Sequence, residues 1–480
     1  MNQFSTKNGT TGTNRAPGVR AKSSRWPGLV VTLVAVLVDM IDNQIVTVAL
    51  PTIQHRLGAS DSGLQWVSAS YALGFALTLI TGARLGDRFG YRTLFVSGMI
   101  VFTTASLAAG LAPSAEVLIV ARIAQGIGSG LMVPQVLSFI QTEFQGAEQG
   151  KAMSLYTLAF PLGGLAGPLL GGILTQSNLF GLSWRSVFFV NVPIGLCGIV
   201  GALLTMPPRR IVARHRFDVL GLLLLTVALV AVFFPIIQGR ELGWPWWAVA
   251  LMVASLPLFA IFFAVLQSSA RRGAEPLIDP VLLRSRSLLA TQSILFIVNA
   301  SVSIFFVLTL HLQNFLGFQP LQAALTFLPA TLGIVAGNML AFRYGARFGR
   351  MLTAIALAAL LLSLVVIAIL VLTMGRALSA GELLAPAVFL GLGMGMALSS
   401  LFGSYFRGVG PEQAGGASGV VNTTVQLGMA SGIAVFGSVY FGNLGSGSSI
   451  ATGWSLLCSA AMVGLGLIVV SAISPRAASN

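Results

Sequence analysis

Charged side chains are scarce in this chain. Asp, Glu, Lys and Arg together make up 8% of the 480 residues, whereas hydrophobic residues make up 55%. A typical soluble protein carries about 25% charged residues, so this chain has too few of them to cover a surface that faces water. The shortage excludes a soluble enzyme, a disordered chain and a fibrous repeat protein, and it predicts a polytopic membrane protein.

Residues that bind metals or form cross-links are scarce too, with 2 cysteines and 3 histidines in the chain. Cys197 and Cys458 lie in separate apolar runs, which excludes a disulfide framework and a zinc cluster. The segment 146–152 resembles a phosphate-binding loop, but it is one residue short and has Ala152 where Ser or Thr must hold magnesium. We therefore expect no metal, no cofactor and no ATP site. A process that requires energy would then have to use an ion gradient, with protons favoured over sodium.

Long apolar runs are abundant instead. A helix needs about 20 predominantly apolar residues to cross a bilayer, and the chain has fourteen runs of this kind. They are too long for membrane strands and lack an alternation of period two. The predicted fold class is therefore an all-α polytopic membrane protein, with spans near 28–51, 64–83, 94–112, 116–141, 152–174, 186–206, 218–237, 246–267, 288–310, 322–341, 352–373, 384–404, 418–441 and 454–473.

Positive charges lie mainly on one side of these spans. With a cytoplasmic amino terminus, 22 of the 27 Lys and Arg fall in cytoplasmic segments, 4 fall in outer loops, and Arg122 falls within a span. This asymmetry follows the positive-inside rule, so the net charge of +14 reports orientation and gives no support to nucleic-acid binding. We expect a multi-pass protein of a bacterial cytoplasmic (inner) membrane with both termini in the cytoplasm.

A short basic segment occurs twice. Residues 84–91 read RLGDRFGY and residues 343–350 read RYGARFGR, so five of eight positions agree. Either two basic loops match by chance, or the chain contains two duplicated halves, which we favour because each segment follows the second span of a six-span set. Repeat-built transporters bind substrate between their halves. The predicted organisation is a cytoplasmic tail (1–26), a six-helix bundle (27–207), a basic linker with two inserted helices (208–285), a second six-helix bundle (286–474) and a short tail (475–480).

Several segments resemble the motifs of one transporter family. LVDMIDNQIVTVALP (37–51) resembles Leu-Asp-x-Thr-x-Val-Asn-Val-Ala-Leu-Pro, and GARLGDRFGYR (82–92) resembles the loop Gly-x-Leu-x-Asp-Arg-x-Gly-Arg-Arg. LIVARIAQGIGSGLMVP (118–134) contains Arg-x-x-Gln-Gly, and PLGGLAGPLLGG (161–172) matches an antiporter Gly-Pro motif that WRSVFFVNVPIG (184–195) follows. Residues 30–475 thus resemble the major facilitator superfamily, and within it the fourteen-span drug:proton antiporters. The resemblance implies two six-helix bundles with two inserted helices.

Three charged residues lie deep within the predicted spans: Asp39, Asp42 and Arg122. A charge at the centre of a membrane helix costs about 2.5–3.5 kcal/mol, so these side chains should face the bundle interior. Burial and a neighbouring carboxylate both disfavour the charged form of an acid, as proton coupling requires. The resemblance implies coupling roles for Asp42 and Arg122, which occupy motif positions, and Asp39 is a further candidate. The alternatives are a structural ion pair with Arg122, or Asp39 capping a kink.

The resemblance also implies a gating loop and an antiporter motif. In the loop, charge contacts across the two halves would hold the outward-open state; the alternative is a tight basic turn. The antiporter motif would pack between the halves and prevent proton leak, and ordinary packing of small residues is the alternative. The gating loop comprises Gly86, Asp87, Arg88, Gly90 and Arg92, and the antiporter motif comprises Gly163, Gly167, Pro168, Gly171 and Gly172.

The predicted function is proton-driven export of small amphipathic compounds by alternating access. Two buried acids and one buried base make the site net negative when both acids are ionised, which favours cationic substrates. Narrow export of a single metabolite or natural product is an alternative, and a membrane-embedded lipid-modifying enzyme is a distant one. The expected partners are substrate, protons and the lipid bilayer, with a monomeric protein. The expected cavity residues are polar and uncharged: Asn43, Gln44, Gln125, Gln135, Gln292 and Asn299.

Overall fold

The computed structural model describes residues 25–208, 218–272, 285–409 and 414–472, and within them the chain is built from helices. The predicted tails and the arginines at 209–216 fall almost entirely outside these residues. The helices are α1 Arg25–Leu57, α2 Asp61–Phe89, α3 Tyr91–Leu111, α4 Ala115–Glu143, α5 Gly146–Ser177, α6 Ser186–Phe189, α7 Asn191–Thr205, α8 Val219–Gln238, α9 Trp246–Arg271, α10 Arg286–Val302, α11 Ile304–Leu310, α12 Pro320–Met374, α13 Ala380–Arg407, α14 Ala414–Asn443 and α15 Ser448–Ala472. A π-helical turn at His311–Phe315 and short 3-10 turns complete the set.

Thirteen of the described helical segments are long and apolar enough to cross a membrane, and α2 makes a fourteenth if its two parts count as one span. α2 bends by 46° between Leu79 and Thr81. α12 supplies two spans, because its direction reverses at Gly349. Each predicted span coincides with one of these segments, although individual boundaries differ by up to six residues. The predicted all-helical membrane fold is confirmed.

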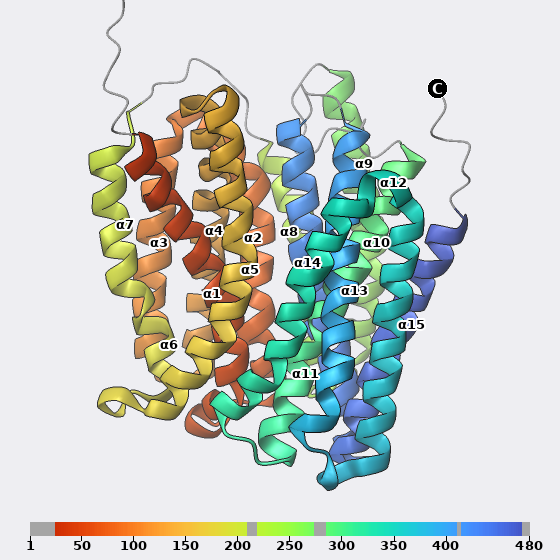
Figure 1. Cartoon of the computed structure of the whole chain (residues 1–480). Coiled ribbons are helices and arrows are strands. Elements are labelled where there is room, and N and C mark those ends of the chain that lie inside the picture. Colours follow the sequence, from red (N-terminus) through yellow and green to blue (C-terminus); the bar gives the residue numbers. More distant parts are fainter. Residues whose placement is uncertain (1–24, 209–217, 273–284, 410–413, 473–480) are drawn as a thin grey trace, which may run out of the picture.

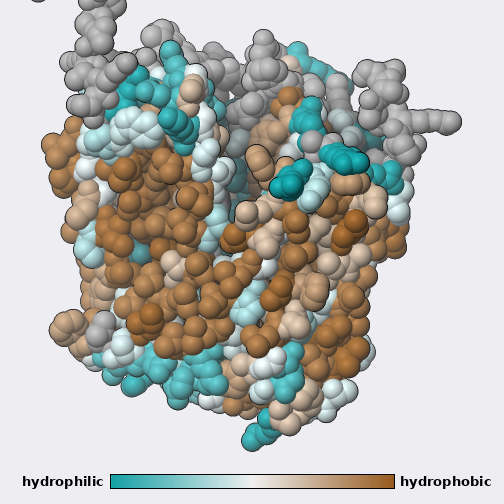
Figure 2. Space-filling view, viewed as in Figure 1, coloured by the Kyte–Doolittle hydropathy of each residue, from teal (hydrophilic) through white to brown (hydrophobic). Residues whose placement is uncertain are grey.

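Apolar side chains cover the middle of the outer surface. Figure 2 shows a hydrophobic belt between two hydrophilic ends. Large side chains in this surface include Leu204, which is 79% exposed, and Leu256, which is 70% exposed. A surface of this kind is too apolar to face water, so the belt is the surface that lipid covers.

The helices pack in two groups (Figure 1). α1 to α7 pack against one another, with α4 in contact with α2 and α3, and α1 in contact with α5 and α7. In the second group α12 packs against α13 and α15, and α10 packs against α14. The groups meet where α5 contacts α12 and α2 contacts α14. We call the upper end in Figure 1, where α1 begins, the basic end, and the lower end the opposite end.

In both copies of the repeated segment the chain turns at the basic end on a glycine with a positive φ. Gly90 (φ 93°) joins α2 to α3, and Gly349 (φ 37°), at the matching position of the second copy, reverses α12. Within each copy an arginine lies over the ring of the following phenylalanine, at 5.2 Å for Arg88 and 5.4 Å for Arg347. The copies therefore share a backbone turn as well as a sequence.

Each turn is also tied to the last span of its own group. Arg92 donates to the backbone oxygen of Leu203 on α7 at 2.7 Å. Arg350 donates to the backbone oxygen of Ser471 on α15 at 2.5 Å. Arg92 and Arg350 are offset by one position in the alignment of the two copies, yet each ties its turn to the last span of its own group.

The hairpin of α8 and α9 lies against both groups at the opposite end. α8 contacts α2 and α14, and Ser438 of α14 donates to the Ile236 backbone oxygen at 2.7 Å. In the connecting loop, Arg240 pairs with Asp61 at 2.6 Å. Glu241 accepts hydrogen bonds from the amide and hydroxyl of Ser62 at 2.9 and 2.6 Å. Partial burial acts to raise the pKa of Glu241, but the hydrogen bonds from Ser62 outweigh it and hold that pKa below its usual range.

The turn at Gly349 gives a first prediction, with Gly345 as its matched control. No described atom lies within 4 Å of a Cβ built on either residue, but only Gly349 has a positive φ. Gly349→Ala should lower stability by about 1–3 kcal/mol, because a Cβ strains that backbone. Gly345→Ala should raise stability by about 0.5–1 kcal/mol, as for other glycines inside helices. Thermal unfolding of the purified variants in one detergent measures both, and equal effects would contradict the assigned turn.

Candidate functional site

An ion pair lies inside the first group of helices. Arg122 of α4 donates through Nη1 to Oδ2 of Asp42 on α1, and the two side chains are 1% and 0% exposed. Removing two charges from water costs several kcal/mol per ion, and a buried pair is tolerated only when further hydrogen bonds satisfy its remaining atoms. The surroundings of this pair supply such bonds.

Amides and a hydroxyl from three helices complete the pair. Asp42 Oδ1 accepts from Asn191 Nδ2 at 2.6 Å and from Gln125 Nε2 at 3.2 Å. Both amides also donate to Ser106 of α3, at 3.0 Å from Asn191 and 2.7 Å from Gln125. Gln125 Oε1 accepts from Arg122 Nη1 at 3.0 Å. Gln125, expected in the substrate cavity, therefore lies in the polar cluster around the ion pair.

Tyr71 of α2 joins the second buried acid to this cluster. Its hydroxyl donates to Oδ1 of Asp39 and lies 2.8 Å from the Ser129 hydroxyl. Its ring faces Arg122, with 4.3 Å from Cζ to the ring centroid. Asp39 is fully buried, and its Oδ2 has no hydrogen-bond partner among the described residues. The two acids thus have different partners: Asp42 is held by a cation, and Asp39 by hydroxyl groups.

A cavity of about 290 Å³ lies between the two groups of helices. Asn43, Gln44 and Asn299, all expected there, line it, as does Pro168. Gln292 on α10 is not among the lining residues. Gln135 is buried elsewhere and donates to the Gly82 backbone oxygen of α2 at 2.8 Å. The other lining residues are Met40, Thr47, Val48, Phe75, Val133, Pro161, Gly164, Val302, Phe305, Thr309, Phe327, Thr331, Ile334, Asn338, Met394, Leu398, Phe402, Asn422, Val425, Gln426 and Met429.

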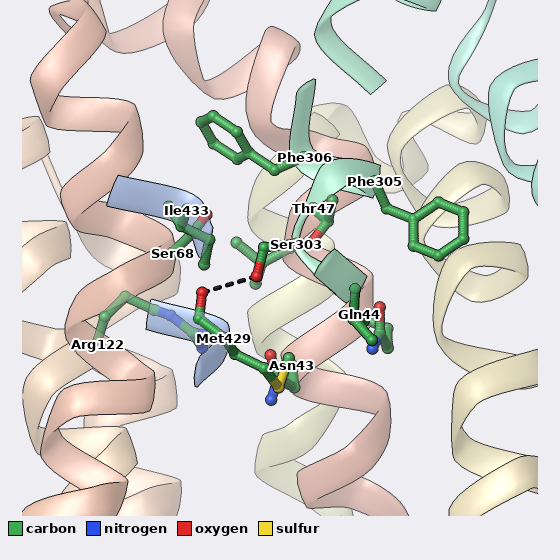
Figure 3. A pocket seen from close by; sticks show the side chains of 12 residues that line it. Asn43, Gln44, Thr47, Ser68, Arg122, Ser303, Phe305, Phe306, Met429 and Ile433 are labelled. Atoms are coloured by element: carbon green, nitrogen blue, oxygen red, sulfur yellow. Dashed lines mark hydrogen bonds between the residues drawn. The ribbon is translucent and has the colours of Figure 1, made fainter. Parts of the chain in front are cut away.

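A smaller pocket has Arg122, the cation of the ion pair, in its wall (Figure 3). Its volume is about 30 Å³, and Arg122 and Ser68 form part of its wall. A pocket of this size can hold one or two water molecules. The pocket and the cavity share six residues, so the two spaces adjoin: Asn43, Gln44, Thr47, Val302, Phe305 and Met429.

The glycines of the antiporter motif pack closely on neighbouring helices. A Cβ on Gly167 would lie 2.6 Å from Gln44 Cβ, and one on Gly171 would lie 2.8 Å from the Ile45 backbone oxygen. Gly163 faces Met40 in the same way, so three motif glycines allow α5 to approach α1. Gly172 faces the other group of helices, where a Cβ would lie 2.7 Å from Leu321 Cα on α12. The motif therefore packs both within one group and between the groups.

The residues of the predicted gating loop lie at the basic end. Gly86 packs against Gln135, Gly90 makes the turn, and Arg92 bonds to α7. Asp87 and Arg88 belong to the last turn of α2 and are exposed. The loop therefore lies at the other end of the molecule from the hydrogen bonds that join the two groups at the opposite end.

Hydrogen bonds join the two groups at the opposite end. Gln313 of the π-helical turn donates to the Val48 backbone oxygen at 2.9 Å. The Leu321 amide donates to Gln176 of α5 at 3.3 Å. The cavity lies on the basic-end side of these contacts, since Phe402 and Asn338 line it near the basic ends of their spans. The cavity is therefore closed towards the opposite end.

Metal-binding side chains do not gather in the described part of the chain. It holds no group of three or more His, Cys, Asp and Glu that could bind a metal ion.

Known proteins share both the sequence pattern and the fold of this chain. The family model described as Major Facilitator Superfamily matches residues 32–266 and 209–433. The chain belongs to the major facilitator superfamily. Solved structures of superfamily transporters share the fold: PepTSo, of the POT family, has a TM-score of 0.68 at 17% identity, with 92% of this chain and 97% of that chain covered. A bacterial homologue of the human lysosomal transporter Spinster has a TM-score of 0.65 at 16% identity, with 94% and 97% covered.

Superfamily relatives with higher identity are named as exporters and resistance proteins. A protein of Streptomyces coelicolor described as a probable actinorhodin transporter is 38% identical over 91% of this chain and 76% of its own. The cephamycin export protein CmcT of Amycolatopsis lactamdurans is 36% identical over 89% and 86%. The multidrug resistance protein Stp of Mycobacterium tuberculosis is 31% identical over 86% and 75%. The chain is thus a membrane transporter of the superfamily and not an enzyme, as the sequence predicts.

Sequence reasoning missed two residues of the site, Tyr71 and Asn191. Asn191 is a polar residue within the apolar stretch of the segment WRSVFFVNVPIG, which was a usable signal. Tyr71 gave no comparable signal, because its role depends on the direction in which α2 presents its side chain. The sequence predicted Asp39, Asp42 and Arg122 as buried charges, and all three are buried.

The ion pair gives a second prediction. Arg122→Leu should destabilise the protein by about 3–5 kcal/mol, because it leaves the Asp42 carboxylate buried without its cation. Adding Asp42→Asn removes that unpaired charge, so the double variant should unfold at a higher temperature than Arg122→Leu alone. Arg92→Leu is the control for loss of an arginine near the surface. If the two substitutions destabilise additively, the charges do not interact as the structure shows.

Proposed function

We propose that this transporter is a proton-driven antiporter that exports small organic compounds from the cytoplasm by alternating access. The observation that carries the proposal is the adjacency of the two spaces: the small pocket beside Arg122 shares six wall residues with the cavity. A proton that neutralises Asp42 changes the charge balance at Arg122, and hence the field at the cavity wall. Substrate and proton thereby influence each other without direct contact.

The charge balance supports this coupling. Asp42 ionised neutralises Arg122, whereas Asp42 protonated leaves the guanidinium unpaired in a buried site. An unpaired buried charge is costly, so protonation favours a conformation in which Arg122 finds water or another acceptor. Asp39, which the hydroxyl of Tyr71 holds beside the same arginine, is the second candidate for a transported proton.

We further propose that the basic end faces the cytoplasm and that the chain makes fourteen spans, with α2 counted as one. The support is the excess of Lys and Arg in the connections at that end. In this orientation the cavity is on the cytoplasmic side of closed outer contacts, which corresponds to an inward-facing conformation. The protein then resides in a bacterial cytoplasmic membrane with both termini inside, and reporter domains fused after Arg240 and Arg272 should report opposite sides.

The range of substrates has two supported alternatives. One is the export of many compounds, which is supported by the relative named as a multidrug resistance protein. The other is narrow export of one natural product, which is supported by the relatives named for actinorhodin and cephamycin. A growth-inhibition panel in cells without their own exporters separates these alternatives.

The coupling gives a third prediction. In proteoliposomes with an imposed pH gradient, Asp42→Asn should abolish gradient-driven transport, because the amide can neither release nor take up the proton. Glu116→Gln, which changes an exposed acid at the end of α4, is the control and should transport like the wild type. Asp39→Asn in the same assay reports whether the second acid is needed. Gradient-driven transport by Asp42→Asn at the wild-type rate would place coupling elsewhere.

A further inference from the structure

The wall of the cavity is mainly apolar, with amide and threonine side chains interspersed, and it carries no charge. None of the described residues that line it is acidic or basic. Asp39 and Asp42 are fully buried outside it, and Arg122 reaches only the smaller pocket. A cation in the cavity would lose water without gaining a carboxylate partner, which is costly. The cavity itself therefore does not favour the cations that the buried charges alone suggest.

We propose, on the basis of the function proposed above, that the cavity takes uncharged, flat, polycyclic compounds with hydrogen-bonding groups along their edges, seated on the backbone of Gly164. The inference combines three features of the wall: a flat site on α5, aromatic rings, and a set of side-chain amides.

The flat site is formed by Pro161, Gly164 and Pro168, which lie three and four residues apart and so share one face of α5. Gly164 differs from its neighbours Gly163 and Gly167, which pack on α1. No described atom lies within 4 Å of a Cβ built on Gly164. A side chain at residue 164 would therefore extend into the space of the cavity.

Aromatic rings contribute to the wall on the other group of helices. Phe305 and Phe327 contact each other edge to face, with ring centroids 5.1 Å apart. Phe402 adds a third ring from α13. Flat aromatic ligands gain from offset or edge-on contact with such rings. A ligand between these rings and α5 would present its faces to apolar groups.

The amides supply neutral donors and acceptors for the edges of the ligand. Each amide offers both functions, which suits keto, hydroxyl and carboxamide groups. Gln426 and Thr309 are 4% and 0% exposed, and each has a buried side-chain oxygen without a partner among the described residues. An unpaired buried oxygen destabilises the protein, and a hydrogen-bond donor on the ligand would remove that cost. The six amide residues in the wall are Asn43, Gln44, Asn299, Asn338, Asn422 and Gln426.

The first test measures the width of the cavity. Gly164→Val should reduce pH-gradient-driven transport of an uncharged four-ring dye by about tenfold or more, and should change transport of an uncharged one-ring compound by less than about twofold. Gly464→Val is the matched control, because Gly464 on α15 also has open space around its Cβ position and does not line the cavity. An equal effect of Gly164→Val on both compounds, or none on either, overturns the proposed seat.

The second test measures charge preference without a gradient. Fluorescence binding to purified protein in detergent should show tighter binding of the uncharged four-ring dye than of the same ring system carrying a quaternary ammonium group. Gln426→Glu should reverse this order, because it places a carboxylate in the wall, and Gln426→Leu should weaken binding of the uncharged dye. Tighter binding of the cation by the wild type overturns the proposal.

The two assays keep this inference distinct from the proposed function. Binding of the uncharged dye without any pH-gradient-driven transport would defeat antiport and leave the ligand class standing. Gradient-driven transport restricted to the cationic dye would support antiport and would overturn the proposed ligand class.

Discussion

The ion pair of Asp42 and Arg122 holds four helices together in the interior of the first group of helices. α1 and α4 supply the charges, α7 supplies Asn191, and α3 supplies Ser106. In hydrocarbon no solvent can replace a lost partner, so each of these helices must present its polar residue at one depth and in one direction. The packing of the first group follows from that requirement. The close approach of α5 to α1 through Gly163, Gly167 and Gly171 adds a second requirement on the packing, which is purely steric.

The same pair lies close to the cavity, because the small pocket beside Arg122 shares six wall residues with it. Asn43 and Gln44 immediately follow Asp42 in α1 and line both spaces. In the proposed coupling, a change in the hydrogen bonding of Asp42 would reach these two residues within a single helical turn. Charge and ligand recognition remain separate in space: the acids lie behind the wall, and the wall itself is neutral.

The sequence was sufficient for the spans, because a bilayer fixes the length of an apolar helix and the chain repeats that length many times. It also identified the turn of the repeated segment, since Gly90 and Gly349 are the residues that tolerate a positive φ. It could not give the rotation of each helix about its own axis, which depends on packing against neighbours. Gln125 and Gln135 were assigned to the cavity on polarity alone, but their helix α4 turns them towards Asp42 and α2. Gly164 was missed for the same reason, since only the packed structure separates it from Gly163.

The hairpin of α8 and α9 connects the two groups of helices, because it contacts α2 of one group and α14 of the other. Its loop binds α2 through the Arg240–Asp61 pair and through the hydrogen bonds that Ser62 donates to Glu241. Its first helix binds α14 by accepting a hydrogen bond from Ser438. α2 and α14 are themselves in close contact near this end, where a Cβ on Gly437 would lie 2.6 Å from the Gln65 amide nitrogen. In the proposed alternating-access cycle, these two helices would separate at the opposite end. The hairpin could follow only one of them, so each such opening would break either the pair at Asp61 or the bond at Ser438. The hairpin contacts would then stabilise the conformation in which that end is closed.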